Sequence, residues 1–475
     1  MKRQNIIYKS LLLLFAVTTL IGCSEDYLEE PAPTQSVSED VIFDSREAVE
    51  AFFAGIYRRS RSQFTSYDSG GIYSMYMARS VKGNDLINTP SWFSFDYDND
   101  NREPTYRRTV FSWEYPYYMI NQLNALINGV ESSEGLSDND RAELIAEARV
   151  LRAFNYFQLA MEFQHTYSFD PSLPAPPIYT ELSLEGKPMI TLQELYDFIL
   201  EDLESSVEVL GDNRINKSYV NRSVAYGILA RVYQVMGKWS NAEMAAVEAY
   251  GGDASAVLDP QSYANGFDDI NNAEWLWGLP QRSDQTNYYY GAPSAFTDHY
   301  GQAYSSVYVN PNFVDEFSGT DVRNTFENAY GLEPGDYREY VTNKFTFAFD
   351  SDIVLMRTPE MILIEAEAMY HQGRENEAHD LLFKLQSNRD SQAVKSNNTG
   401  NDLFEEILLE RRKELYAEIG VEWFDAKRLR RGIVRDPIHR TVLTLEPDDK
   451  RFFLKIPQRE IDANDEIDES VNSSR

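Results

Sequence analysis

Residues 221–250 read NRSVAYGILARVYQVMGKWSNAEMAAVEAY and hold the pattern that decides the fold. Two apolar segments with helical spacing flank Gly237, and small side chains recur among the large ones at set distances. The positions that carry this pattern are Tyr226, Leu229, Ala230, Tyr233, Ala242 and Ala249. Because small side chains let two helices approach closely, the stretch predicts a helical hairpin.

The same order of residues recurs 136 positions further along the chain, which predicts a second hairpin over about 359–387. The matching places are taken by Ile362, Ala366, Met369, Gly373, Ala378 and Leu385. The spacing in both stretches is typical of tetratricopeptide repeats, and one such repeat cannot bury its apolar face alone. We therefore predict a mainly α fold in which tetratricopeptide-like hairpins stack as a scaffold, with helices near 45–60 and 140–163 available as further members.

The helix near 140–163 is predicted by apolar side chains at steps of three or four, which form one buried stripe. Asp138 or Asp140 is expected to cap its start. Another helix is expected over about 191–210, where Thr191 and Glu194 have the spacing of a capping box.

Residues 253–350 lack helical periodicity and are rich in Tyr, Phe, Asn, Asp and Gly. This composition predicts a long loop-rich region with a few short strands and short helices. Loops of this length inside a compact protein are often functional, so we expect the ligand-binding region here.

The single cysteine, Cys23, ends an apolar run that follows Lys2, Arg3 and Lys9. The run is shorter than the about 20 residues that a spanning helix needs. With Gly22 before it, the cysteine has the place of the lipid-bearing residue of a bacterial lipoprotein. An uncleaved anchor helix is the alternative. We expect residues 1–22 to be a signal peptide and Cys23 to carry the lipid.

The rest of the chain divides by composition. Residues 23–44 are acidic, contain two prolines and are expected to form a tether. Residues 45–475 are expected to form one globular unit, with an N-terminal part over about 45–250 and a loop-rich and C-terminal part over about 251–475. One cysteine excludes an internal disulfide, and the hydrophobic content of 43% is enough for an ordinary core. The net charge of -32 and the lack of a basic stripe argue against nucleic acid as a partner.

Several blocks of the sequence resemble the SusD/RagB family, in the order in which that family has them. They are AEARVLRAFNYFQLA (146–160), RTPEMILIEAEA (357–368) and ERRKELYAEIGVEWFDAKR (410–428). The chain departs from the family pattern by one extra residue between Leu415 and Trp423 and by Glu422, where a basic residue is common. The resemblance implies a lipoprotein fastened to the outer membrane, facing the cell exterior, that captures an oligosaccharide or polysaccharide. The implied partner is a SusC-like TonB-dependent transporter, although RagB-like members of the family deliver peptides instead.

Sugar capture requires flat aromatic faces and polar groups for the hydroxyls. Two segments supply both, residues 84–95 and residues 281–304. The candidate ligand-binding residues are Asn84, Asp85, Trp92, Phe93, Tyr288, Tyr289, Tyr290 and Tyr300. Trp92 is the strongest single candidate, and the alternative for each ring is that it packs its loop onto the scaffold. Trp113, Trp239 and Trp423 lie on helical patterns and are expected in the core.

Other charged residues favour structural roles. Glu410, Arg411, Arg412, Glu414 and Arg428 have the spacing of ion pairs between packed helices. Asp96, Asp98 and Asp100 imitate the start of a calcium loop, but the sixth position is Asn101 and the twelfth is Arg107, so no metal site is expected. No catalytic motif is present, so we expect a protein without catalytic residues and without a cofactor. A glycosidase and a tetratricopeptide scaffold that binds other proteins remain as alternatives from other classes.

Overall fold

The hairpin expected over 221–250 is formed by α9 (Arg222–Met236) and α10 (Trp239–Tyr250). Gly237 ends α9 with φ 69°, a left-handed conformation that favours glycine. The second hairpin is formed by α13 (Thr358–His371) and α14 (Glu375–Arg389). Both predictions are confirmed, and α10 packs directly against α13, so the two hairpins are neighbours in the stack.

The computed structural model describes residues 42–62, 64, 66–257, 259–263, 265–284, 293–301 and 304–475. Cys23 and Tyr288–Tyr290 lie outside these residues. No helix in the described part of the chain is both long and apolar enough to cross a lipid bilayer.

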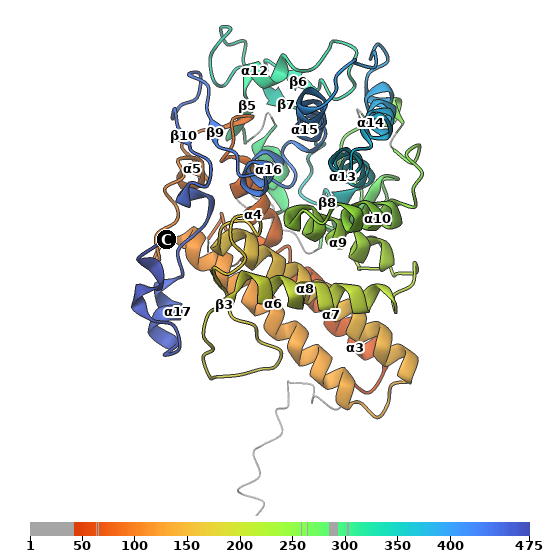
Figure 1. The fold of residues 1–475 in the computed structure, drawn as a ribbon, viewed down its shortest axis with the longest axis vertical. Helices are drawn as coiled ribbons and strands as arrows, with labels where there is room; N and C mark the ends of the chain where they lie inside the picture. The colour runs from red at the N-terminus through yellow and green to blue at the C-terminus, as the bar shows by residue number, and fades with distance from the viewer. Residues whose placement is uncertain are drawn as a thin grey trace, which may run out of the picture.

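The helices pack one on the next along the long axis of the molecule (Figure 1). The stack begins with α3 (Arg46–Arg59), α6 (Arg107–Ser132), α7 (Asp138–Phe163) and α8 (Leu192–Val207). It continues through the two hairpins to α15 (Asn401–Leu415) and α16 (Val421–Arg428). The fold is thus mainly α and built from helical hairpins, as the sequence predicts.

The helix starts follow local side-chain chemistry. The capping box at α8 is confirmed, since the Thr191 side chain accepts from the Glu194 backbone and Glu194 accepts from the Thr191 backbone. The cap of α7 was assigned to the wrong residue, because Ser137 takes that place and its Oγ accepts from the Asp140 N–H at 3.1 Å. A serine just before two aspartates is equally able to cap, and the sequence did not separate these choices.

Short elements fill the region between α10 and α13. Others connect the helices of the stack or follow α16 near the C-terminus. The helical ones are α4 (Gly71–Ser80), α5 (Ser94–Tyr97), α11 (Pro260–Tyr263), α12 (Pro311–Val314), α17 (Gln458–Ala463), and the 3-10 turns η2 (Pro293–His299), η3 (Lys450–Phe452) and η4 (Glu469–Asn472). The antiparallel strand pairs are β1 (Leu86–Asn88) with β5 (Val307–Val309), β2 (Pro174–Ala175) with β3 (Ile190–Thr191), β4 (Trp275–Leu279) with β8 (Ile353–Arg357), β6 (Phe326–Glu327) with β7 (Val341–Thr342), and β9 (Ile433–Val434) with β10 (Thr444–Leu445). The prediction of loops and short elements over 253–350 is confirmed.

Of the three tryptophans expected in the core, two are buried and one is partly buried. Trp423 is fully buried and Trp113 is 4% exposed. Trp239 is only half-buried, with its ring stacked on His371 at 3.9 Å between centroids. The largest cluster of buried apolar side chains runs through the stack and under the loop-rich part, and two smaller clusters lie among α13, α14 and α15.

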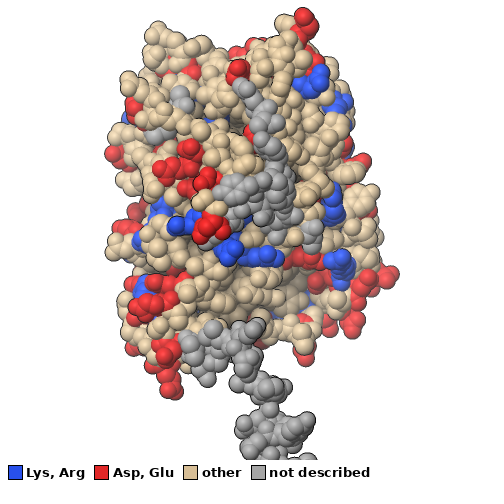
Figure 2. All heavy atoms as spheres, turned by 180° about the vertical axis from the view of Figure 1, so that it is seen from behind, with Lys and Arg blue, Asp and Glu red and all other residues tan. Residues whose placement is uncertain are grey.

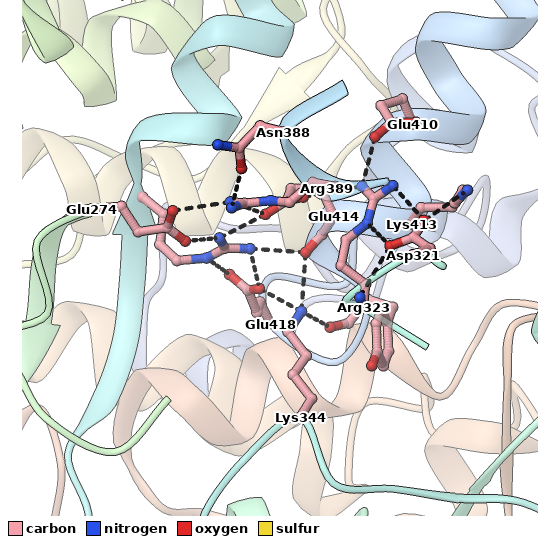
Figure 3. A network of polar contacts seen from close by, with 12 residues as sticks. Glu274, Asp321, Arg323, Lys344, Asn388, Arg389, Glu410, Lys413, Glu414 and Glu418 are labelled. Carbon is pink, nitrogen blue, oxygen red and sulfur yellow. Dashed lines mark hydrogen bonds and ion pairs between the residues drawn. The ribbon is translucent and has the colours of Figure 1, made fainter. Parts of the chain in front are cut away.

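A buried ionic network joins the loop-rich part to the C-terminal helices (Figure 3). We define it by Glu274, Asp321, Arg323, Lys344, Arg357, Arg389, Glu410, Lys413, Glu414 and Glu418. Glu414 on α15 lies at its centre, with one oxygen 2.8 Å from Arg357 Nη1 and the other 3.1 Å from Arg323 Nη1. Burial alone would raise the pKa of Glu414, but Arg389, Arg357 and Arg323 hold it well below its usual value.

Further ion pairs connect the same helices. Arg411 contacts Asp425 at 2.9 Å, and Arg428 contacts both Asp425 at 2.7 Å and Glu367 at 2.6 Å. All of these side chains are nearly or fully buried. The expectation of ion pairs between packed helices is confirmed for Arg411, Arg428 and Glu414. Glu410 and Arg412 pair instead with Arg323 and Asp85, which lie outside the helices. The buried ion pairs tie residues of the loop-rich part, such as Arg323 and Glu274, to the C-terminal helices and neighbouring β8.

Candidate functional site

The two segments expected to bind ligand lie side by side. Strand β1 pairs with β5 in antiparallel register, with Leu86 opposite Val309 and Asn88 opposite Val307. The Thr89 N–H extends this contact by donating to the Ser306 carbonyl at 2.8 Å. These contacts place residues 84–95 against the strand that directly follows the second segment, and Phe93 contacts Phe296 and His299 within that segment.

Trp92 and Tyr67 form an aromatic pair at the protein surface. Their ring centroids are 4.6 Å apart and their planes meet at 75°. Trp92 is half-buried and Tyr67 is 36% exposed, so both rings keep some surface in contact with solvent. Arg107, at the first turn of α6, places its guanidinium 5.6 Å from the Trp92 ring centroid. Arg107 is itself held by an ion pair of 3.2 Å with the buried carboxylate of Asp68.

Phe93 anchors this loop from below. It is fully buried, and its ring contacts Phe296 at 5.8 Å and His299 at 6.0 Å between centroids. Trp92 precedes Phe93 in the same turn and is only partly buried. Phe93 was expected to contact ligand, but its ring has no exposed surface in this structure and holds the loop in place instead.

His299 belongs to the same support. Its Nδ1 lies 2.6 Å from Ser306 Oγ, and burial lowers the pKa of the imidazole to about 3. The ring is therefore neutral at physiological pH and does not offer acid or base chemistry there. Tyr300 is likewise buried, with its ring against Phe345, and burial raises the pKa of its phenol. Tyr300, a ligand-binding candidate from the sequence, thus lies in the core.

Asn84 and Asp85 have structural partners. The Asn84 amide donates to Asp436 Oδ2 at 3.1 Å and accepts from the Asp436 N–H at 2.8 Å. Asp85 is 3% exposed and forms an ion pair with Arg412 on α15, with Nε donating to Oδ2 at 2.9 Å. Of the candidate residues within the described part of the chain, Trp92 alone keeps an aromatic face toward solvent.

The aspartates that imitate a calcium loop point to separate partners. Asp96 is fully buried against Arg108, at 3.0 Å, while Asp98 accepts from Thr441 Oγ1 at 2.8 Å and lies near Arg440. Among the residues that the structure describes, no group of three or more His, Cys, Asp or Glu side chains could hold a metal ion.

Sequence reasoning missed Tyr67 and Arg107, the two side chains that complete the Trp92 surface. Tyr67 lies in a short loop between α3 and α4 without any periodic signal, and Arg107 looks like an ordinary first-turn residue.

An aromatic hollow of about 410 Å³ lies elsewhere, between α6 and α17. Trp113, Tyr117, Tyr118 and Tyr179 line it, together with carboxylates. The aromatic content of α6 is its only sequence signal.

The chemistry of the Trp92 surface suits binding. It offers two aromatic rings at a steep angle and a guanidinium beside one of them, which suits a ligand with alternating apolar and hydroxyl-bearing faces.

Two family models match the chain. One, described as starch-binding and associating with the outer membrane, matches residues 26–234, and the SusD family model matches residues 348–472. Together they span more than half of the chain.

Individual proteins extend this likeness. A SusD-like protein of Bacteroides ovatus is 26% identical over 246 residues, which cover 50% of this chain and 41% of that protein. A SusD-like protein of Formosa agariphila is 21% identical over 500 residues, covering 92% and 94% of the two chains. The solved structure of a SusD-like carbohydrate binding protein of Bacteroides vulgatus is 27% identical, with a TM-score of 0.81 over 90% of this chain and 98% of that one.

Proposed function

This chain belongs to the SusD/RagB family, and from that premise we propose that it captures oligosaccharides at the cell surface and delivers them to a SusC-like TonB-dependent transporter. The observation that carries the proposal is the outward ring of Trp92 beside Tyr67, at the point where the two candidate segments meet. Peptide capture of the RagB kind is the competing function within the same family.

The physical basis is the match between a pyranose and the Trp92 surface. The C–H face of a sugar ring is apolar and flat, so it packs on an indole, while its edge carries hydroxyls that need donors and acceptors. Arg107 provides donors beside the indole, and its ion pair with Asp68 fixes the direction in which they point. Capture of this kind involves no bond cleavage, so the protein acts as a binding subunit without catalytic residues.

The proposed delivery to a transporter places a requirement on the affinity of the site. Exposed sugar sites bury little area and must desolvate hydroxyls, so we expect a modest affinity for any one oligosaccharide. A modest affinity suits delivery, because the ligand must leave the binding protein again to enter the transporter.

Replacement of Trp92 by alanine tests the proposal. Loss of the indole face should weaken glycan binding by about 1–2 kcal/mol, roughly tenfold in Kd. Purified protein from residue 24 onward would be compared with W92A on affinity gels containing a panel of polysaccharides and by titration calorimetry. W239A is the matched control, since Trp239 is also half-buried but lies on α10, against His371. It should leave glycan binding unchanged.

The outcomes separate the alternatives. Retention of full binding by W92A, at unchanged thermal stability, would remove Trp92 from the site. Binding of mixed peptides without any glycan would favour RagB-like import, and capture of folded proteins alone would favour a tetratricopeptide scaffold. Release of reducing sugar at an enzyme-like rate would indicate a glycosidase.

Anchoring by a lipid on Cys23 is part of the same proposal. It rests on the apolar run and the small residue before the cysteine. A C23A variant should disappear from the membrane fraction of cells and from the material that protease removes from intact cells. An unchanged distribution of C23A between these fractions would contradict the lipid anchor.

A further inference from the structure

Three arginines converge on one pocket beside α3. The pocket has a volume of about 370 Å³ and opens where the end of α3 meets the segment before α9 and the residues that follow β4. Its polar lining is made by Arg58, Arg61, Asn216, Ser218, Tyr219 and Arg282, and we call it the arginine pocket. These side chains come from three stretches that are far apart in the sequence.

The arginine pocket differs in charge from the rest of this acidic protein. The chain has 76 Asp and Glu residues against 44 Lys and Arg, yet the described lining of this pocket contains no carboxylate. The hollow between α6 and α17 has the opposite lining, with Glu114, Glu185 and Glu460 and, within the described residues, no basic side chain. In Figure 2 several basic side chains lie across the middle of the face, with acidic ones beside them at the left and others toward the lower edge. The two hollows thus differ in the charge of their linings.

The guanidinium groups of the pocket lie near one another. Arg58 and Arg282 are exposed, and neither forms an ion pair within the part of the chain that the structure describes. Arg61 is half-buried, and its Nη1 donates to Gln281 Oε1 at 3.2 Å. Burial lowers the pKa of Arg61, and the positive charges of Arg58 and Arg282 lower it further. An anion bound between them would relieve this repulsion.

Two nearby carboxylates, Asp352 and Asp284, offset part of this repulsion at Arg61. The Asp352 oxygens accept from the backbone N–H groups of Ile270 at 2.7 Å and Gln281 at 2.6 Å. Asp284 acts on Arg61 at longer range and is exposed. Neither aspartate lines the pocket itself.

The remaining lining fits a sugar that carries the charge. Tyr219 presents a partly buried ring, packed on Tyr57 at 4.6 Å between centroids. Asn216 and Ser218 lie on the same stretch, where the Ser218 hydroxyl and N–H donate to Asn216 Oδ1 at 2.7 and 2.9 Å, and the Asn216 amide group adds a donor to the lining. A guanidinium recognises a carboxylate or sulfate through parallel N–H···O bonds, and a ring with polar neighbours suits the pyranose that bears it.

We propose that the arginine pocket binds the carboxylate or sulfate groups of an acidic glycan and so makes this protein selective for charged polysaccharides. The inference rests on the proposed function and names the class of glycan. The pocket is also linked to the candidate site, because the Arg61–Gln281 bond joins the end of α3 to the start of residues 281–304.

The test compares charged and uncharged forms of the same polymers. The probes are polygalacturonate with its full methyl ester, and a sulfated galactan with the same galactan after desulfation. The wild-type protein should bind at least one charged form about tenfold more tightly than its neutral partner, and added salt should reduce the difference. Which of the two pairs shows the preference tells carboxylate from sulfate.

The R58Q/R282Q variant should lose this preference and keep the affinity for the neutral form. Both guanidinium groups are exposed, so its thermal unfolding midpoint should match that of the wild type. R430Q/R431Q is the matched control, because it removes the same charge from two half-exposed arginines that pair with Asp448 and Glu405. It should retain the preference for the charged polymer.

Two results would overturn the inference. Equal wild-type binding of charged and neutral forms would do so while leaving glycan capture intact, and so would a preference that survives in R58Q/R282Q. Absence of binding to every polymer, charged or neutral, would instead refute the proposed function, and this inference with it.

Discussion

Arginines of the buried ionic network and arginines of the arginine pocket have opposite surroundings. In the network, Arg357 lies 2.5 Å from Glu274, 2.8 Å from Glu414 and 2.7 Å from Glu418. In the pocket, Arg58 and Arg282 face solvent and Arg61 donates to an uncharged amide. The network arginine is thus matched by three carboxylates in contact with it, whereas Arg61 has two like charges, Arg58 and Arg282, among its neighbours.

The direction of the pKa shifts expresses this difference. Burial lowers the pKa of both Arg357 and Arg61, but Glu418, Glu414 and Glu274 reverse the effect at Arg357 and raise its pKa above the usual value. At Arg61 the neighbouring arginines act in the same sense as burial. Removal of one carboxylate from the network should therefore leave buried charge uncompensated, whereas Arg58 and Arg282 face solvent.

The largest expected effect comes from the network. E414Q removes the one carboxylate that contacts Arg323, Arg357 and Arg389 together and leaves three buried guanidinium groups with less compensation. We expect the free energy of unfolding to fall by about 3–5 kcal/mol. Urea unfolding at pH 7, followed by tryptophan fluorescence, measures the change.

E405Q is the control for that prediction, because it makes the same substitution on the same helix. Glu405 is exposed and pairs with Arg431 at the surface, so its loss should cost about 0–1 kcal/mol. If E414Q unfolded at the same urea concentration as E405Q, buried charge matching would not distinguish the network from the surface.

The helical frame was predictable because its signals are local. Small and large side chains around Gly237, and the capping box at Thr191, lie within one or two helical turns of the residues that they organise. The charged run of residues 410–428 also predicted ion pairs between helices, although it did not identify which residues would pair with each other. Such patterns depend on helix geometry, which the sequence specifies directly.

The candidate site was less predictable because its members meet only in the folded chain. Asp85 looked like a ligand-binding residue, but Arg412, 327 positions away, takes its carboxylate. Phe93 and Trp92 are adjacent and similar, and only the packing of Phe296 and His299 decides which of them points inward. The arginine pocket is assembled from three distant stretches, none of which carries a basic run.

Glu147 is a buried carboxylate that can be compared with Glu414 of the network. Glu147 on α7 accepts a hydrogen bond from the Tyr57 hydroxyl at 2.7 Å, and no ion pair of Glu147 is present among the described residues. Burial raises the pKa of Glu147 to about 7, with the Tyr57 hydrogen bond opposing the shift. Where Glu414 is held charged by arginines, Glu147 thus holds its proton up to nearly neutral pH.

The pH dependence of stability should follow from this raised pKa. The folded state binds the proton of Glu147 more tightly than the unfolded state, whose carboxyl has the ordinary pKa near 4.5. The stabilisation is therefore complete below about pH 4.5 and is lost as the pH rises through about 7. E147Q keeps an uncharged side chain at every pH, so it should be more stable than the wild type at pH 8, by about 1–2 kcal/mol, and should lose that advantage at pH 5.

Urea unfolding of both proteins across this pH range measures the effect. The control is E143Q, one turn earlier on α7, which retains Glu147 and should show the wild-type dependence of unfolding free energy on pH. Parallel pH profiles for E147Q and the wild type would mean that Glu147 is ionised in the fold without an arginine beside it, and that charge matching is not what separates the two kinds of site.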